Sequence, residues 1–167
     1  MKKLWTLGGV ALLVALLVSL VGIGSAGAST LSAQGEFAPS SPSGSTETFT
    51  SDETNECLGA YNSTTVLAES APCAGPDDSW DVSVVTGGWR TLGSLGYSGH
   101  CLDDSSAGLR LVGCNGLSYQ HWGVSWTDGN VLVMFQNQAT GACLLGIDQY
   151  PGVYAGPCDN KSDQWWY

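Results

Sequence analysis

The sequence predicts an all-β domain built from three copies of one unit. A cysteine–leucine pair begins at positions 57, 101 and 143, so that successive pairs lie 44 and 42 residues apart. A second cysteine and then a tryptophan follow each pair: Cys73 and Trp80, Cys114 and Trp122, Cys158 and Trp166. Independent markers that share one period indicate internal repetition. No segment after residue 28 has a sustained helical period, and glycine is abundant, which favours short strands.

The first 28 residues are predicted to be a secretory signal peptide. Two lysines, Lys2 and Lys3, precede an uncharged and largely apolar segment over 4–24, and Ala26 and Ala28 then supply a cleavage pattern. An uncleaved membrane anchor is the alternative, because about 20 apolar residues can also span a bilayer. We therefore expect a secreted protein without stable membrane association, or, if cleavage fails, a membrane-anchored one.

Residues 29–45 are predicted to be a disordered linker. They are mostly Ser, Ala, Gly, Pro and Thr, as in FAPSSPSGS, and carry too few apolar side chains to offset the entropy of ordering. Residues 46–167 have the size of one domain. The repeats are expected over about 46–86, 87–128 and 129–167.

Each repeat is expected to consist of short strands and hairpins. Segments 122–126 and 131–135 are rich in β-branched and aromatic residues, and the Asp-Gly between them suits a tight turn. Gly87 and Gly88 supply a similar turn between the first two repeats. Since no unit of about 40 residues can bury its apolar face alone, the three should pack around one axis as a closed six-stranded barrel capped by three hairpins.

Charge and cysteine content limit the partners. Beyond residue 28 the chain holds three basic and fifteen acidic residues, a net charge of −12. Such a surface repels phosphate, so we expect neither nucleic acid nor an anionic membrane as a partner. Six cysteines in an exported chain predict disulfides, and their spacing does not suit zinc. We expect no metal and no cofactor.

The repeated motifs resemble those of the ricin B-type lectins, which are β-trefoil proteins with a QxW repeat, like carbohydrate-binding modules of family 13. Gln120-His121-Trp122 and Gln164-Trp165-Trp166 match the motif. The first repeat departs from it with Asp78-Ser79-Trp80. An ionised aspartate accepts hydrogen bonds but cannot donate as an amide does, so we expect repeat one to be less regular there.

The resemblance implies a structural role for most of the repeated residues. It implies three disulfides, one within each repeat, and each loop closure should stabilise the fold by about 3 kcal/mol. It also implies that the three tryptophans fill the core and that the glutamine amides bond backbone groups. The implied pairs are Cys57 with Cys73, Cys101 with Cys114 and Cys143 with Cys158, and the core residues are Trp80, Trp122 and Trp166.

The resemblance also implies where sugar would bind. In the family, an aspartate directly after the Cys-Leu pair takes hydrogen bonds from sugar hydroxyls, an aromatic side chain lies shortly before the second cysteine, and an asparagine precedes the glutamine. Repeat two has Asp103, but Val112 at the aromatic position and Tyr119 at the amide position. Asp103, Tyr119 and Gln120 are therefore the candidate carbohydrate-binding residues. The alternative for Asp103 is a turn acid that bonds backbone amides.

The other two repeats are less complete. Repeat three has Leu145 in place of the acid, although Tyr154, Asp148 and Asp163 lie nearby. Repeat one has Gly59 at that position and offers only loop candidates, Tyr61 and Asn62.

We do not expect an enzyme. His100 and His121 lie in no recognisable catalytic or metal-binding motif, and the acid pairs Asp77-Asp78 and Asp103-Asp104 are more typical of solvated turns than of a glycosidase. Two hypotheses remain. The first is a secreted lectin-like protein whose partner is a glycan or polysaccharide, with one principal weak site in repeat two. The second is a sugar-blind β-trefoil that acts as a protein–protein interaction module.

Overall fold

A computed structural model describes residues 45–127 and 131–167. The predicted signal peptide and all but the last residue of the predicted linker lie outside the described residues, as does most of the turn predicted before Val131. Ser45, the last linker residue, begins the first strand. Within the described residues the structure contains strands and short 3-10 turns but no α-helix, which confirms the all-β prediction.

The strands group by repeat, with Ser45 counted in repeat one. Repeat one contains β1 (Ser45–Glu47), β2 (Glu56–Ala60), β3 (Val66–Ser70) and β4 (Trp80–Val84). Repeat two contains β5 (Arg90–Ser94), β6 (His100–Ser105), β7 (Gly108–Gly113) and β8 (Trp122–Trp126). Repeat three contains β9 (Val133–Asn137), β10 (Cys143–Gly146) and β11 (Val153–Gly156). Short 3-10 turns lie at Thr86–Gly88 (η1), Ser118–Gln120 (η2) and Ser162–Gln164 (η3).

The strands that begin and end each repeat form the barrel. β1, β4, β5, β8 and β9 pair in that order, each antiparallel to the next. The C-terminal residues close the ring, because Trp166 bridges both Val133 of β9 and Ser51, which follows β1. The Thr50 amide donates to the Tyr167 carbonyl at 2.8 Å at the same seam. The last barrel position is thus held by isolated bridges rather than by a full strand.

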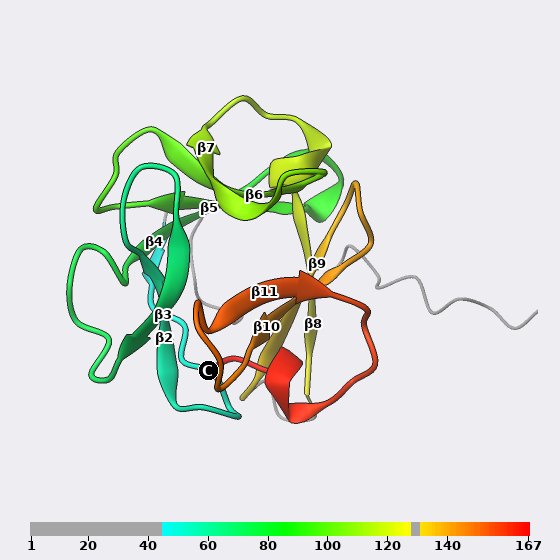
Figure 1. The fold of residues 1–167 in the computed structure, drawn as a ribbon. Helices are drawn as coiled ribbons and strands as arrows, with labels where there is room; N and C mark the ends of the chain where they lie inside the picture. The colour runs from blue at the N-terminus through cyan, green and yellow to red at the C-terminus, as the bar shows by residue number, and fades with distance from the viewer. Residues whose placement is uncertain (1–44, 128–130) are drawn as a thin grey trace, which may run out of the picture. The chain divides into compact units, whose positions relative to one another are not determined.

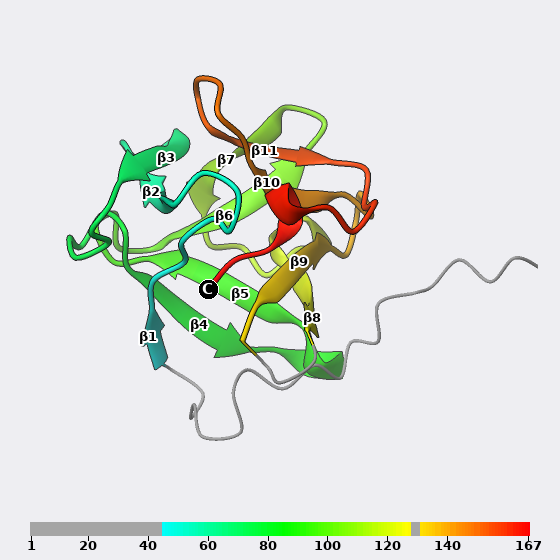
Figure 2. The same cartoon turned by 90° about the horizontal axis from the view of Figure 1, so that it is seen from below.

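The inner pairs of strands form three hairpins at one end of the barrel. β2–β3, β6–β7 and β10–β11 surround a common axis in Figure 1. In Figure 2 the hairpins lie in the upper part of the view and the barrel strands β4, β5, β8 and β9 lie below them. This is the barrel with three capping hairpins that the repeats predict, the β-trefoil architecture.

Two turns join the repeats in the barrel. Gly87 and Gly88 have φ angles of 82° and 80°, a conformation that glycine adopts without strain, and they turn the chain from β4 into β5. The strand predicted over 131–135 instead begins at Val133 and continues to Asn137. The amide of Thr127 donates to the Leu132 carbonyl at 3.0 Å, and Val131 is 67% exposed. Val131 and Leu132 therefore belong to the turn.

One contact, repeated three times, links the two motifs of each repeat. The indole N–H of the motif tryptophan donates to the carbonyl of the leucine in that repeat's Cys-Leu pair. The bonds are Trp80 to Leu58 at 2.8 Å, Trp122 to Leu102 at 3.1 Å and Trp166 to Leu144 at 3.2 Å. All six residues are buried in the core. A large ring can be buried there because its one polar group has a partner.

The disulfides are those implied by the resemblance. Cys57 is joined to Cys73, Cys101 to Cys114 and Cys143 to Cys158. Each disulfide closes a loop within its own repeat, so each repeat is stapled independently of its neighbours. A membrane-spanning helix is absent from the part of the chain that the structure describes.

Candidate functional site

The hairpin β6–β7 positions the predicted carboxylate of repeat two. Asp103 on β6 lies directly opposite Arg110 on β7, and Arg110 Nε is 3.5 Å from Asp103 Oδ1. Asp103 is only 4% exposed, whereas the Arg110 side chain is 41% exposed. Arg110 also donates to the Ser105 hydroxyl at 3.3 Å. The arginine therefore covers the carboxylate and neutralises its charge.

Tyr119 lies in η2, a 3-10 turn that packs against β6. The residue is 41% exposed, and its carbonyl accepts a hydrogen bond from Asn137 Nδ2 at 2.8 Å. The backbone of Tyr119 is thus anchored while its ring remains available. Among the described residues, no hydrogen bond or ion pair joins Tyr119 to Asp103.

Gln120 lies beneath the surface of this region. Its side chain is fully buried; Oε1 accepts from the Asn115 amide at 2.9 Å and Nε2 donates to the Gly113 carbonyl at 3.1 Å. Gln120 therefore connects the end of β7 to η2 and sets the position of Tyr119. In this conformation it has no surface that a sugar could contact.

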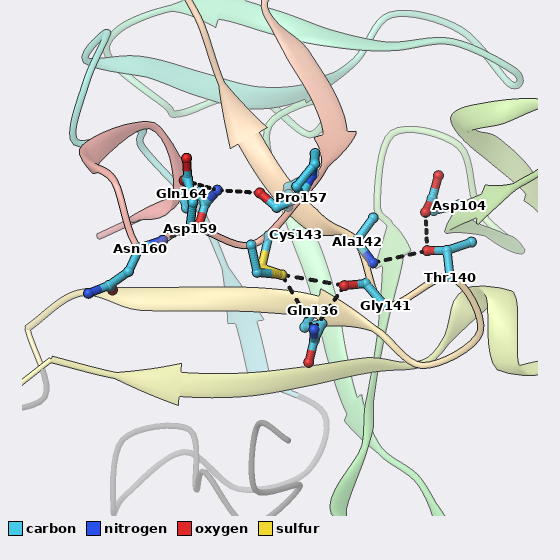
Figure 3. The surroundings of a disulfide bond; sticks show 12 residues. Asp104, Gln136, Thr140, Gly141, Ala142, Cys143, Pro157, Asp159, Asn160 and Gln164 are labelled. Carbon is cyan, nitrogen blue, oxygen red and sulfur yellow. Dashed lines mark hydrogen bonds between the residues drawn. A yellow bond between two sulfur atoms is a disulfide. The ribbon is translucent and has the colours of Figure 1, made fainter. Parts of the chain in front are cut away.

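The equivalent residue of repeat three has the same role with more partners. Gln164 Oε1 accepts from the amides of Asp159 and Asn160 at 3.0 and 2.9 Å. Its Nε2 donates to the Pro157 carbonyl and to Asp159 Oδ1, both at 2.8 Å. Figure 3 shows this amide beside the disulfide of repeat three, between the loop after β11 and η3.

Repeat one departs at this position, as its sequence predicts. Asp78 accepts from the Gly75 amide at 3.4 Å, a longer bond than those of either glutamine, and no 3-10 turn forms there. The carboxyl of Glu69 lies close by. Burial raises its pKa above the usual value, and repulsion from Asp78 and Asp77 raises it further. The absence of an amide donor leaves three carboxyl groups close together.

A cavity of about 570 Å³ lies where the three hairpins meet. Repeat one contributes the turn before β3, repeat two contributes the tip of β6–β7, and repeat three contributes β11 and the loop that precedes it. The lining residues with polar side chains are Thr64, Thr65, Asp104, Arg110, Tyr150 and Tyr154. Arg110 thus borders both the Asp103 region and this cavity.

Asp104 ties repeat two to repeat three. It is 5% exposed and accepts a short hydrogen bond from the Thr140 hydroxyl in the turn between β9 and β10 (Figure 3). Burial raises the pKa of its carboxyl, the Thr140 hydrogen bond lowers it, and the negative charge of Asp103 raises it. Strand alternation places Asp104 on the opposite side of β6 from Asp103.

The weaker candidates of the other repeats are dispersed. Asp148 is exposed and borders a separate hollow of about 220 Å³ together with Glu56. Asp163 lies in η3 and Tyr61 is 64% exposed in a loop. Tyr154 lines the cavity between the hairpins, together with residues from the other two repeats.

Arg110, Asp104 and Tyr150 are not among the residues predicted from the sequence. The register of the hairpin places Arg110 opposite Asp103, and this pairing could have been inferred from the tight Ser106-Ala107 turn between the strands. The meeting of Asp104 with Tyr150 depends on the packing of different repeats, for which the sequence carries no local signal.

The two histidines contact a backbone carbonyl and a side-chain amide. His121 Nδ1 lies 2.8 Å from Gln138 Oε1, and His100 Nδ1 lies 3.3 Å from the Ser98 carbonyl. Over 45–127 and 131–167, no three His, Cys, Asp or Glu side chains are placed to hold a metal ion.

Comparisons with known proteins identify structures with a similar fold, at low sequence identity. No model of a protein family matches the sequence, and no curated protein matches it. Among solved structures, BEL β-trefoil aligns with a TM-score of 0.68 at 13% identity over 80% of this chain and 97% of the other. The Macrolepiota procera ricin B-like lectin, solved with lactose, aligns with a TM-score of 0.61 at 21% identity, covering 75% of this chain and 95% of the lectin.

A third similar structure is an enzyme. The GlcNAcα1-4Gal releasing endo-β-galactosidase from Clostridium perfringens aligns with a TM-score of 0.63 at 12% identity over 73% of this chain. The likeness spans only 31% of that enzyme. At these identities the comparisons confirm the β-trefoil fold, and the function has to be inferred from the residues of this chain.

Proposed function

We propose that this protein is a secreted, non-catalytic carbohydrate-binding protein with its principal site on hairpin β6–β7. The fold supports the proposal, because one of the similar structures is a ricin B-like lectin solved with lactose. The proposal for this chain depends on its own polar pair, Asp103 and Arg110.

The geometry of that pair carries the proposal. Asp103 Oδ1 and Arg110 Nε are buried and form an ion pair with each other at 3.5 Å, but neither atom makes a hydrogen bond among the described residues. Such atoms usually find partners, because an unmade hydrogen bond costs about 1–3 kcal/mol. A sugar hydroxyl can accept from Nε and donate to Oδ1 at once. Because the Arg110 side chain is 41% exposed, it can move outward to admit the hydroxyl.

Tyr119 supplies the apolar part of the proposed site. Its exposed ring can cover the C–H face of a sugar, and the backbone bond to Asn137 limits its freedom before binding. Gln120 supports this turn from below. With one ring and one hydrogen-bonded pair, we expect a millimolar site, about −4 kcal/mol.

Glycan-array binding followed by titration calorimetry tests the proposal on the disulfide-intact protein. Asp103→Ala and Tyr119→Ala should each weaken binding by about tenfold, whereas Tyr61→Ala, which removes an exposed ring from repeat one, should leave it within about twofold. Circular dichroism should show that all three variants are folded. Binding that is unchanged in both repeat-two variants would place the site elsewhere, and no binding to any glycan would refute a lectin function.

The burial of Asp103 favours a second candidate function. At 4% exposure, covered by Arg110, the carboxylate also suits a structural role in a sugar-blind β-trefoil that binds a protein. In that case no glycan on the array binds. A photoreactive group placed at position 119 should cross-link a partner protein in the secreted fraction, and the same group placed at position 61 should not.

Secretion is the remaining part of the proposal. The apolar segment over 4–24 and the Ala26-Gly27-Ala28 pattern support cleavage after Ala28. Amino-terminal sequencing of the exported protein should therefore begin at Ser29. A chain that retains Met1 and sediments with membranes would indicate an anchor.

A further inference from the structure

We infer that the cavity between the three hairpins is a second saccharide-binding site, composed of residues from all three repeats. This inference rests on the proposed function, since it assigns the same class of ligand to a different place. The cavity, at about 570 Å³, falls within the range of small-molecule sites, about 300–1,000 Å³. Because each repeat contributes to its lining, it exists only in the assembled fold.

Two tyrosines of repeat three line the cavity. Tyr150 is 86% exposed and Tyr154 is 36% exposed. The Tyr154 hydroxyl donates to the Tyr150 carbonyl at 2.8 Å, so the ring of Tyr154 is held in place by the backbone of the loop that carries Tyr150. The fixed ring of Tyr154 offers a stacking surface whose ordering cost is already partly met, and Tyr150 adds a second, exposed ring.

Polar residues of the other two repeats also line the cavity. Arg110 and Asp104 come from repeat two, and the buried Asp104 carboxylate accepts a hydrogen bond from Thr140. Thr65 from repeat one adds a hydroxyl that forms no side-chain hydrogen bond among the described residues. Aromatic rings facing donors and acceptors are what a saccharide requires, because its ring has apolar C–H faces and a polar edge.

Charge favours a neutral saccharide over an acidic one. Arg110 is the cationic residue of the lining, and its charge is already balanced by Asp103 at 3.5 Å. Asp104 adds a carboxylate to the same cavity, and the chain beyond residue 28 carries a net charge of −12. These negative charges would repel a uronic acid or a sulfated sugar, whereas a neutral pyranoside would experience no such repulsion.

The position of Arg110 makes the two sites neighbours. Arg110 pairs with Asp103 through its guanidinium and is also one of the residues that line the cavity. Ligands at both sites would share one domain, so a branched or extended glycan could gain avidity without a second protein molecule.

Nuclear magnetic resonance of the ¹⁵N-labelled, disulfide-intact protein tests the inference. The probes are the methyl pyranosides of glucose, galactose, mannose and N-acetylglucosamine, titrated into the millimolar range. At least one probe should shift the amide signals of Thr65, Leu109 and Val153. Tyr150→Ala should weaken this binding about five- to tenfold, because it removes one ring and leaves the carbonyl that accepts from Tyr154.

The matched control is Tyr167→Ala, which removes an exposed ring at the C-terminus that is not part of the cavity lining. It should leave the titration unchanged. Tyr119→Ala should also leave the cavity signals unchanged, while weakening shifts around η2 if the repeat-two site binds. A Tyr150→Ala protein that binds as tightly as the wild type refutes the cavity site.

The outcomes separate this inference from the proposed function. Binding that Asp103→Ala and Tyr119→Ala weaken but Tyr150→Ala does not would keep the repeat-two site and overturn the cavity site. The reverse pattern would support the cavity and remove the repeat-two site. The absence of any shift with every probe, together with a blank glycan array, would overturn both.

Discussion

Replacing the buried glutamines by glutamate should test how the Gln-x-Trp motif stabilises the fold. The substitution keeps the size and shape of the side chain and exchanges one N–H₂ donor for an oxygen. Gln120→Glu loses the bond to the Gly113 carbonyl, whereas Gln164→Glu loses bonds to the Pro157 carbonyl and to Asp159. Gln164 therefore loses twice as many donor bonds.

The magnitude follows from these contacts. An unsatisfied buried carbonyl costs about 1–3 kcal/mol, and an ionised carboxylate in the same place adds repulsion and desolvation. Because Gln120 is fully buried, the Gln120→Glu substitution should lower the free energy of unfolding by about 3 kcal/mol at neutral pH. Gln164→Glu should lose about 4–5 kcal/mol, because its new carboxylate would lie against that of Asp159, now 2.8 Å from Nε2.

Thermal unfolding at several pH values measures the effect. For a domain of this size, 1 kcal/mol corresponds to about 4 °C, so Gln120→Glu should lower Tm by about 12 °C at neutral pH. Burial raises the pKa of the introduced carboxyl, and a protonated carboxyl can again donate to Gly113. The deficit should therefore shrink as the pH falls below that raised pKa. Gln149→Glu, at an exposed position, is the control and should have little effect.

Three results would refute this account. They are a loss below about 0.5 kcal/mol in both variants, a greater loss for Gln120→Glu than for Gln164→Glu, and a deficit that does not change on acidification. Each would mean that the amide donors do not stabilise the loops that they contact.

Other stability predictions follow from the same structure. Because the pKa of Glu69 is raised on folding, ionisation of this carboxyl destabilises the fold. Glu69→Gln should therefore raise Tm at neutral pH, and this gain should disappear well below pH 4.5. Equal changes in Tm for Glu69→Gln and for the control Glu56→Gln would contradict this. Replacing Cys143 and Cys158 together by alanine should cost about 3 kcal/mol in denaturant unfolding, and a cost near zero would show that the loop is ordered without its disulfide. Thr140→Val should cost about 1–2 kcal/mol at neutral pH, because it leaves a buried carboxylate oxygen without its donor, and an unchanged unfolding midpoint would show that water replaces the hydroxyl.

The candidate site was only partly predictable. Asp103 was identified because it directly follows a Cys-Leu pair, and Tyr119 because it precedes a motif glutamine. Their environments were not identified: Arg110 covers Asp103 through cross-strand register, and the structure shows no bond between Asp103 and Tyr119 in the described part of the chain. Gln120 lies under the site instead of in contact with solvent.

The fold was predictable because its determinants recur at a fixed period. Three tryptophans, three Cys-Leu pairs and three second cysteines define the barrel, the core and the disulfides, and each of these interactions lies within one repeat. A contact within a repeat is encoded in local spacing, and repetition makes that spacing visible. The boundary of β9 was less accurate, because two apolar residues of the turn continue the pattern of the strand.

By itself, the sequence determined the β-trefoil, the pairing of the cysteines through the family resemblance, and the buried tryptophans. Only the tertiary structure decided which side chains from different repeats meet: Thr140 with Asp104, and Tyr150 and Tyr154 with Arg110 around one cavity. These residues lie on loops and hairpin tips that the threefold packing brings together. Their meeting depends on the shape of the assembled barrel, which no single repeat specifies.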